Sequence, residues 1–195
     1  MSLADDKQRI RQETVNKILA MKREQRDVEE IELAEKLVTL PGFEGASKIL
    51  LFASYFAEEI RTEPFFKKVI NCGKLLICPR VDRRTRSLQL FEVKDFAKDL
   101  RPGTMGIPEP MAECRQIDPL EVDWVLVPGL AFDGKCSRLG RGAGYYDRLL
   151  PTLRHEAMRW SLILEAQWVD EVPMEPHDVP LDGIASCSRT AIRRR

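Results

Sequence analysis

Four short, mostly apolar runs constrain the fold of this chain more than any other feature. They cover residues 48–53, 75–79, 124–128 and 161–165. Apolar runs of this length are typical of strands that are buried on both faces, as in parallel sheets. Because segments with helical spacing alternate with them, the sequence predicts an α/β fold with a mostly parallel sheet flanked by helices.

The helical segments are marked by spacing and by capping residues. Residues 4–40 contain neither Pro nor Gly, and apolar residues recur with helical spacing on either side of the polar run 22–30. We therefore expect two successive helices with a turn in that run. A further helix is expected to start with Thr62 as its cap and Pro64 in its first turn, and to stop at Gly73.

The remaining segments are shorter. Alternating residues at 87–93 predict a half-exposed or edge strand. Loops are expected at 101–119 and 172–180, a turn entering a helix at 142–153, and a short strand at 183–186. No linker divides the chain, so residues 1–195 are predicted to form one domain, with a flexible tail at 190–195. The N-terminal helices over 1–40 are expected to pack on one side of it.

The balance of charged side chains limits the kinds of molecule that this protein is expected to bind. The 195 residues include 31 basic and 31 acidic side chains, so the formal net charge is zero. A protein that coats a duplex needs a basic surplus to displace counterions, so we expect no nucleic-acid partner. No apolar run approaches the roughly 20 residues of a membrane helix, so we expect no membrane association either. The chain is expected to be a monomer.

The five cysteines indicate a reducing compartment. They are odd in number, widely spaced and contain no Cys-x-x-Cys pair. Such a set fits neither a secreted disulfide framework nor a zinc site. Because the N-terminal residues also include no apolar signal segment, the sequence predicts a cytoplasmic protein with reduced thiols.

The densest chemical signal follows the run 124–128. It contains Pro-Gly-Leu-Ala-Phe-Asp at 128–133 and then Arg-Leu-Gly-Arg-Gly-Ala-Gly-Tyr-Tyr-Asp-Arg at 138–148. Ligands of open α/β sheets bind beyond the carboxyl ends of strands, where this segment should lie. Its glycines let backbone N–H groups face a phosphate, and Arg138 and Arg141 add bidentate donors. Asp147 is placed to hold Mg²⁺ against such phosphates.

Two common phosphate-binding motifs are excluded here. No Lys-Ser or Lys-Thr follows the glycines, so the segment is not a P-loop. The dinucleotide pattern Gly-x-Gly-x-x-Gly fails because Tyr145 or Asp147, depending on register, replaces its third Gly. On these residues alone an anion site and a structural tight turn remain alternatives, because glycines at helix starts are often only turn residues.

Taken whole, the string closely resembles the 5-formyltetrahydrofolate cyclo-ligase family, also called 5,10-methenyltetrahydrofolate synthetases. Three weaker stretches extend the resemblance over nearly the whole chain and fall in the expected order. They are Lys7-x-x-x-Arg11, Glu59-Ile-Arg-Thr62 and Val-Pro-x-Glu-Pro-His-Asp-Val-Pro-x-Asp at 172–182. The resemblance implies a three-layer Rossmann-like domain, of the class that includes phosphosugar isomerases and CoA transferases.

The resemblance also implies residue roles. ATP would be bound by Lys7, Arg11, Arg138, Leu139, Gly140, Arg141, Gly142, Ala143, Gly144, Tyr145 and Tyr146. The folate would be contacted by Glu59, Arg141, Gly142, Ala143, Gly144 and Tyr145. Asp147 and Asp178 would bind Mg²⁺, and Arg138 and Arg141 would be catalytic. Ala143 is a departure, because family members often carry Gly or Lys there.

The implied reaction closes 5-formyltetrahydrofolate to 5,10-methenyltetrahydrofolate and converts ATP to ADP and phosphate. In the family mechanism the γ-phosphoryl group passes to the formyl oxygen, N10 of the folate attacks the formyl carbon, and phosphate leaves. Phosphoryl transfer needs positioning and charge neutralisation rather than a protein nucleophile. A site of Arg, Lys, Gly and carboxylates meets that need.

Individual residues also have plainer interpretations. Lys7 and Arg11 share one helix face and could be solvated surface. Tyr145 and Tyr146 are consecutive, so one of them is expected to pack while the other faces a ligand. His177 is expected to belong to a metal-linked loop rather than to act as a general base.

Two whole-protein alternatives remain. One is a folate- or nucleotide-binding protein of the same fold without turnover, and the presence of all four residues Lys7, Arg11, Asp147 and Asp178 argues against it. The other is a nucleic-acid binder that would use Arg148 with its neighbouring arginines and the C-terminal ones, which the zero net charge disfavours.

Overall fold

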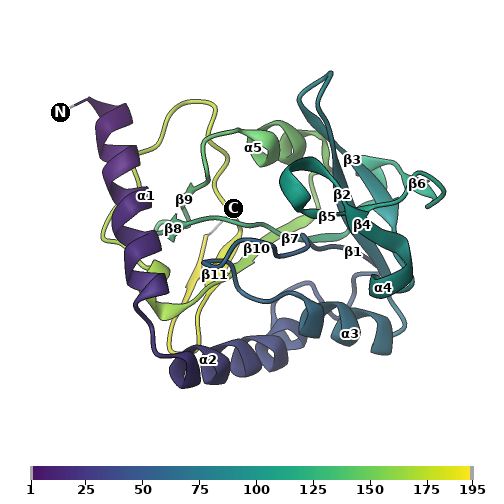
Figure 1. Ribbon diagram of the computed structural model, residues 1–195, viewed down its shortest axis with the longest axis horizontal. Coiled ribbons are helices and arrows are strands. Elements are labelled where there is room, and N and C mark those ends of the chain that lie inside the picture. Colours follow the sequence, from purple (N-terminus) through teal and green to yellow (C-terminus); the bar gives the residue numbers. More distant parts are fainter. Residues whose placement is uncertain (1, 194–195) are drawn as a thin grey trace.

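The computed structural model describes residues 2–193 and confirms a three-layer α/β fold (Figure 1). Eight strands form the main sheet in the spatial order β12-β11-β10-β7-β1-β2-β3-β6. Their bounds are β1 Lys48–Leu50, β2 Leu75–Asp82, β3 Ser87–Glu92, β6 Gln116–Ile117, β7 Trp124–Leu126, β10 Met158–Leu162, β11 Gly183–Ala185 and β12 Thr190–Ile192. The five strands from β11 to β2 are parallel, and β12, β3 and β6 are antiparallel to their neighbours.

Five α-helices and two short hairpins surround the sheet. The helices are α1 Leu3–Leu19, α2 Arg23–Lys36, α3 Glu63–Asn71, α4 Phe96–Asp99 and α5 Tyr145–Leu149 among the described residues. The hairpins pair β4 Leu100–Pro102 with β5 Pro108–Pro110, and β8 Ala131–Phe132 with β9 Arg138–Leu139. Short 3-10 turns are η1 Leu37–Thr39, η2 Thr104–Gly106, η3 Pro119–Glu121, η4 Leu150–Thr152 and η5 Glu165–Gln167.

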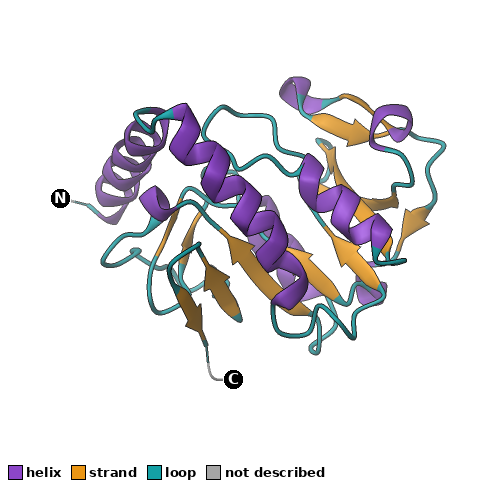
Figure 2. Ribbon diagram, turned by 90° about the horizontal axis from the view of Figure 1, so that it is seen from below, coloured by secondary structure: helices purple, strands orange, loops and turns teal. Residues whose placement is uncertain are grey.

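Alternate residues of the central strands pack to opposite faces and produce the three layers. In β7, Trp124 and Leu126 join the cluster that contains residues of α2 and α3, whereas Val125 joins the cluster beneath α5 and η4. Figure 2 shows α2 and α3 lying across one face of the sheet. Because both faces are covered, these strands are continuously apolar, which is why short apolar runs predicted them.

The first helix lies at the edge of the domain, so the expected packing of both N-terminal helices on one side is only partly correct (Figure 1). Ile10 of α1 packs with Ala131, Leu139 and Val172, and only Ile18 joins the cluster beneath α2. This edge position places one face of α1 beside the β8–β9 hairpin and the loop 172–180.

Several expectations from the sequence need correction. Residues 101–119 are not simply a loop, because they contribute to the β4–β5 hairpin and contain β6. The prolines of that hairpin are tolerated because each of its two strands has a free edge. Residues 87–92 form β3 between β2 and β6, so the half-exposed alternative is correct and the edge-strand alternative is wrong. The strand expected at 161–165 begins earlier, at Met158, and Glu165 lies in η5.

The expected tail from residue 190 also needs correction. Residues 190–192 pair with β11 as β12, while Arg194 and Arg195 lie outside the described residues. All five cysteines are free. Among the described helices, none is long and apolar enough to cross a membrane.

Candidate active site

A cleft of about 690 Å³ opens beyond the carboxyl ends of β1 and β7. Its wall is formed by α1, the loop after β1, the β4–β5 hairpin, the segment 138–147 and the loop 172–180. The cleft brings together every site residue expected from the sequence: Lys7, Arg11, Glu59, Arg138, Leu139, Gly140, Arg141, Gly142, Ala143, Gly144, Tyr145, Tyr146, Asp147 and Asp178.

One end of the cleft contains a buried lysine bound to two carboxylates. Lys7 Nζ lies 2.7 Å from Asp178 Oδ2 and 2.8 Å from Glu175 Oε2. Burial by itself lowers the pKa of Lys7, but the two hydrogen bonds outweigh burial and raise it. The same balance lowers the pKa of Asp178, where burial is outweighed by the hydrogen bonds from Lys7 and from the Glu175 backbone. Lys7 therefore fastens α1 to the loop 172–180.

Arg11 holds the start of the glycine-rich turn. It lies one helical turn after Lys7, and its Nε donates to the Gly140 carbonyl at 2.9 Å. The plain solvated-surface interpretation of these two basic residues is therefore wrong for this structure, since both have specific partners in the cleft wall. Gly142 at φ +99° and Gly144 at φ +67° give that turn its left-handed corners, which favour glycine.

Arg138 is buried in the floor of the cleft. Its Nη2 lies 2.5 Å from Asp147 Oδ1, and its Nη1 donates to the Pro128 carbonyl at 3.2 Å. Its Nε is buried and has no hydrogen-bond partner among the described residues. The hairpin that carries Arg138 is closed by buried Asp133, whose carboxylate accepts from the backbone N–H of Ser137 at 3.0 Å and of Val172 at 2.9 Å.

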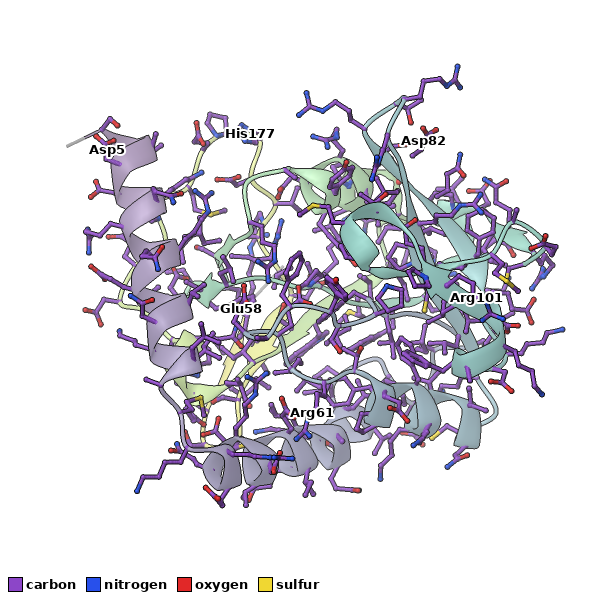
Figure 3. The ribbon with its side chains drawn as sticks, in the orientation of Figure 1. Asp5, Glu58, Arg61, Asp82, Arg101 and His177 are labelled. Carbon is purple, nitrogen blue, oxygen red and sulfur yellow. The ribbon has the colours of Figure 1, made fainter. Side chains whose placement is uncertain are left out.

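The opposite wall pairs Arg141 with the loop after β1. Arg141 Nη2 lies 2.8 Å from Glu58 Oε1 and 3.4 Å from Glu59 Oε1, and its guanidinium stacks 3.8 Å from the centre of the Phe56 ring. The other Glu59 oxygen accepts from the backbone N–H groups of Tyr55 and Phe56. Figure 3 shows Glu58 in this central part of the molecule. Glu58 and Glu59 are both within reach of Arg141.

Arg26 of α2 holds the loop after β1 in place through its backbone carbonyls. Arg26 donates to the carbonyls of Ala57 and Glu59 at 2.5 Å each, while its Nε donates to Glu30 at 3.0 Å. Thr62 occupies the expected cap position of α3, but its hydroxyl accepts from the Ser54 backbone instead of capping the helix. Sequence reasoning missed Arg26, because an arginine in a charged helix carries no local signal of its distant partner. The sequence left the register open by one between Glu58 and Glu59, and both carboxylates lie near Arg141.

Both tyrosines line the cleft, and one of them, Tyr146, also packs into the core as expected. Tyr146 packs against both main clusters, and its buried hydroxyl has no hydrogen-bond partner among the described residues. Burial raises the pKa of that phenol. Tyr145 faces the cleft and carries the guanidinium of Arg148 5.3 Å from its ring centre.

Part of the cleft lining is an apolar wall. It consists of Phe52, Phe56, Val81, Leu88 and Ile107. These residues come from the loop after β1, the β2–β3 pair and the β4–β5 hairpin, so no single stretch of sequence indicated them. The wall suits a flat ring system, because aromatic and branched side chains pack against such rings.

The expected metal ligands face the cleft but form no metal cage. Among residues 2–193, no three carboxylate, His or Cys side chains are grouped to hold an ion. Asp147 and Asp178 are each paired with a cation. Mg²⁺ that arrives with phosphates needs only one or two protein carboxylates, so these two fit such an ion. His177 lies at the outer end of its loop and is largely exposed (Figure 3).

Comparisons with known proteins point to one family. The model of the 5-formyltetrahydrofolate cyclo-ligase family matches residues 4–186. The 5-formyltetrahydrofolate cyclo-ligase of Haemophilus influenzae is 32% identical over 141 residues, which cover 71% of this chain and 75% of the relative. The Mus musculus protein of the same name is 26% identical over 187 residues, covering 91% and 92%. The 5,10-methenyltetrahydrofolate synthetase structure from Aquifex aeolicus matches with a TM-score of 0.84 at 29% identity, covering 97% of this chain and 93% of that one.

Proposed function

The chain belongs to the 5-formyltetrahydrofolate cyclo-ligase family, whose members are enzymes of folate-dependent one-carbon metabolism. We propose that it uses ATP to close 5-formyltetrahydrofolate to 5,10-methenyltetrahydrofolate. The products would be ADP and phosphate. The observation that carries this proposal is the convergence of Lys7, Arg138 and Arg141 on one cleft that continues as an apolar wall. That arrangement offers a place for a triphosphate beside a place for a ring system.

Three of the cations that line the cleft are each paired with a carboxylate. Lys7 is paired with Asp178, Arg138 with Asp147, and Arg141 with Glu58. A triphosphate would compete for these cations, because guanidinium groups and phosphate oxygens form strong bidentate hydrogen bonds. Mg²⁺ bound with the nucleotide would be held by Asp147 and Asp178 and would neutralise phosphate charge.

The proposed chemistry has two steps. The formyl oxygen attacks the γ-phosphorus of ATP and the bond to ADP breaks, which converts a poor leaving group into a phosphate. The nitrogen N10 then attacks the formyl carbon, the bond from that carbon to the phosphate oxygen breaks, and the N10 proton is lost to solvent. Phosphate therefore leaves with the oxygen that began on the formyl group.

The residues of this chain would supply position and charge. Arg141 is held by Glu58, Glu59 and the Phe56 ring at the junction of the phosphate end and the apolar wall. A guanidinium there would neutralise charge that develops on the transferring phosphoryl group. Glu59, fixed by two backbone N–H groups, would orient the folate ring by accepting from its N–H donors. Five free thiols support our proposal of a reducing compartment such as the cytoplasm.

The direct test measures methenyl product by absorbance when purified protein is given 5-formyltetrahydrofolate, ATP and Mg²⁺. We expect product, ADP and phosphate in equal amounts, and no product when ATP is left out. Normal ATP binding without any product would contradict the proposal and favour a binding protein of the same fold. Comparing ATP with a non-hydrolysable analogue separates binding from turnover.

A further inference from the structure

We propose that Glu175 is a competing carboxylate, which occupies Lys7 in the free protein and has to release it when the phosphates of ATP bind. Both residues line the cleft. Glu175 would thereby set how tightly the nucleotide is held. This inference rests on the proposed function, since it takes ATP as the ligand that reaches Lys7.

The group formed by Lys7, Glu175 and Asp178 contains one carboxylate more than its cation needs. Lys7 Nζ lies 2.8 Å from Glu175 Oε2 and 2.7 Å from Asp178 Oδ2. At neutral pH, one positive and two negative charges leave this group with a net charge of −1. Arg138 differs, since its one carboxylate partner among the described residues is Asp147. The surplus carboxylate therefore stands where a triphosphate is expected to bind.

The two carboxylates are held to different extents. Asp178 Oδ2 also accepts from the backbone N–H of Glu175 at 2.8 Å, and the backbone N–H of Asp178 donates to the Glu175 carbonyl at 3.0 Å. The Asp178 side chain is 14% exposed and the Glu175 side chain 41%. Within the described chain, the Glu175 carboxylate has Lys7 as its only hydrogen-bond partner. It can therefore turn toward solvent while the backbone of its loop stays in place.

Release of Glu175 would leave the rest of this group intact. Asp178 still binds Lys7 through Oδ2, so α1 and the loop 172–180 remain joined. The other Asp178 oxygen, Oδ1, takes no part in the bonds from Lys7 and from the Glu175 backbone. His177, which Figure 3 labels on the same loop, lies 3.6 Å from this Oδ1. Asp178 therefore suits a permanent partner of Lys7, and Glu175 suits a temporary one.

A phosphate that reaches Lys7 has to enter beside the Glu175 carboxylate. Like charges this close repel each other, most strongly next to a largely buried group such as Lys7. ATP binding then includes the breaking of the bond between Lys7 and Glu175, which weakens the measured affinity. When ADP leaves, Glu175 can return to Lys7. A carboxylate in this position therefore weakens nucleotide binding and favours product release.

The sign of the change in affinity distinguishes this role from the alternatives. A carboxylate that held Lys7 in place for phosphate would strengthen ATP binding, so its removal would raise the Kd. Structural damage to the loop would raise the Kd as well. Removal of a competing carboxylate lowers the Kd.

The test compares two charge-removing variants of neighbouring segments. Glu175→Gln removes the negative charge and keeps a side-chain oxygen that can accept from Lys7. Its matched control is Glu171→Gln, since Glu171 pairs with Lys135, is 69% exposed and does not line the cleft. The Kd for ATP with Mg²⁺ is measured by titration calorimetry without folate. Thermal unfolding checks the fold, and formation of methenyl product is measured in parallel.

We expect Glu175→Gln to lower the Kd for ATP about fivefold, because an ion pair with a partly exposed partner contributes modestly. Added salt should reduce this gain, and Glu171→Gln should keep the native Kd. An unchanged or raised Kd in folded Glu175→Gln would overturn the inference, while product formation by the same samples would leave the proposed function intact. Tighter ATP binding by Glu175→Gln with no product from either protein would support the inference and overturn the proposed function. A native protein that binds no ATP would overturn both.

Discussion

Arg141 is the residue on which the proposed chemistry depends most. It is partly exposed and belongs to neither main cluster, so its removal should leave the fold intact. We predict that Arg141→Ala lowers turnover by about 10² to 10³, the effect typical of removing one charge-stabilising donor. Steady-state rates measure this, with thermal unfolding as the check on folding. Near-normal rates in a folded variant would show that the assigned site is wrong.

Lys7 is expected to have both a structural and a ligand-binding role, and the pH dependence of the free energy of unfolding reports on the structural one. The raised pKa of Lys7 and the lowered pKa of Asp178 mean that their pair stabilises the fold between the unfolded pKa values, about 4 and about 10. Its stabilisation is lost as pH falls below about 4 through the lowered pKa of Asp178. It is lost again as pH rises above about 10 through the raised pKa of Lys7.

We therefore predict that Lys7→Met lowers the free energy of unfolding by about 2 kcal/mol near neutral pH, from the loss of charge-assisted hydrogen bonds in a largely buried pair. Denaturant unfolding should show this difference shrinking below about pH 4. Arg9→Met, which removes an exposed pair with Glu13 on the same helix, is the control and should change little at any pH. A difference for Lys7→Met that persists undiminished at pH 3 would contradict this assignment.

Local motifs and long-range partners differ in how well the sequence predicts them. The string 138–148 indicated the longest continuous stretch of the cleft wall, residues 138–147, because consecutive residues of one turn share one location. Glu175 and Arg26 were missed because their importance lies in partners from other segments, such as the bond between Glu175 and Lys7 across 168 residues. The roles of the individual site residues remain predictions that the kinetic variants test.

At the scale of elements, α2 positions the loop that carries Glu59. Arg26 reaches from α2 to the carbonyls of Ala57 and Glu59, so the helix acts on the cleft without touching it. We predict that Arg26→Lys raises the KM for folate severalfold and leaves the KM for ATP within a factor of two, because the folate side of the cleft loosens. A merely structural role would instead lower thermal stability and alter both KM values together, and that result would contradict the positioning role.

The glycine-rich turn makes a second prediction at this scale. Gly144 has φ +67° at the start of α5, where an L-residue is strained. Gly144→Ala should cost about 1 kcal/mol of unfolding free energy. The control Gly45→Ala should cost less, since Gly45 lacks a left-handed φ and a Cβ there meets nothing within 4 Å. Denaturant unfolding of both variants measures the difference, and equal effects would contradict the strain argument.

Elements were predicted best where packing is uniform. The central strands are covered on both faces, so their composition alone marks them, although β1 spans only three residues of the expected run. The β4–β5 hairpin escaped prediction because its prolines mimic loop composition. The edge position of α1 was not predicted, because an amphipathic pattern shows that a helix packs but not against which element.

At the scale of the whole molecule, zero net charge conceals a strongly patterned distribution. Cations and carboxylates pair around the cleft, where Lys7 binds Asp178, Arg138 binds Asp147 and Arg141 binds Glu58. The cleft wall also joins α1 and the loop 172–180 to the sheet. A nucleotide bound there would hold these parts together and stabilise the folded state by about 2.7 kcal/mol at 100 times its Kd.

The most direct test of the central claim follows one oxygen atom through the reaction. The protein is given ATP, Mg²⁺ and 5-formyltetrahydrofolate labelled with ¹⁸O on the formyl group, and the released phosphate is analysed by mass spectrometry. Transfer of the γ-phosphoryl group to the formyl oxygen predicts one ¹⁸O in each phosphate released with methenyl product. Product formed with unlabelled phosphate would contradict the phosphorylated intermediate.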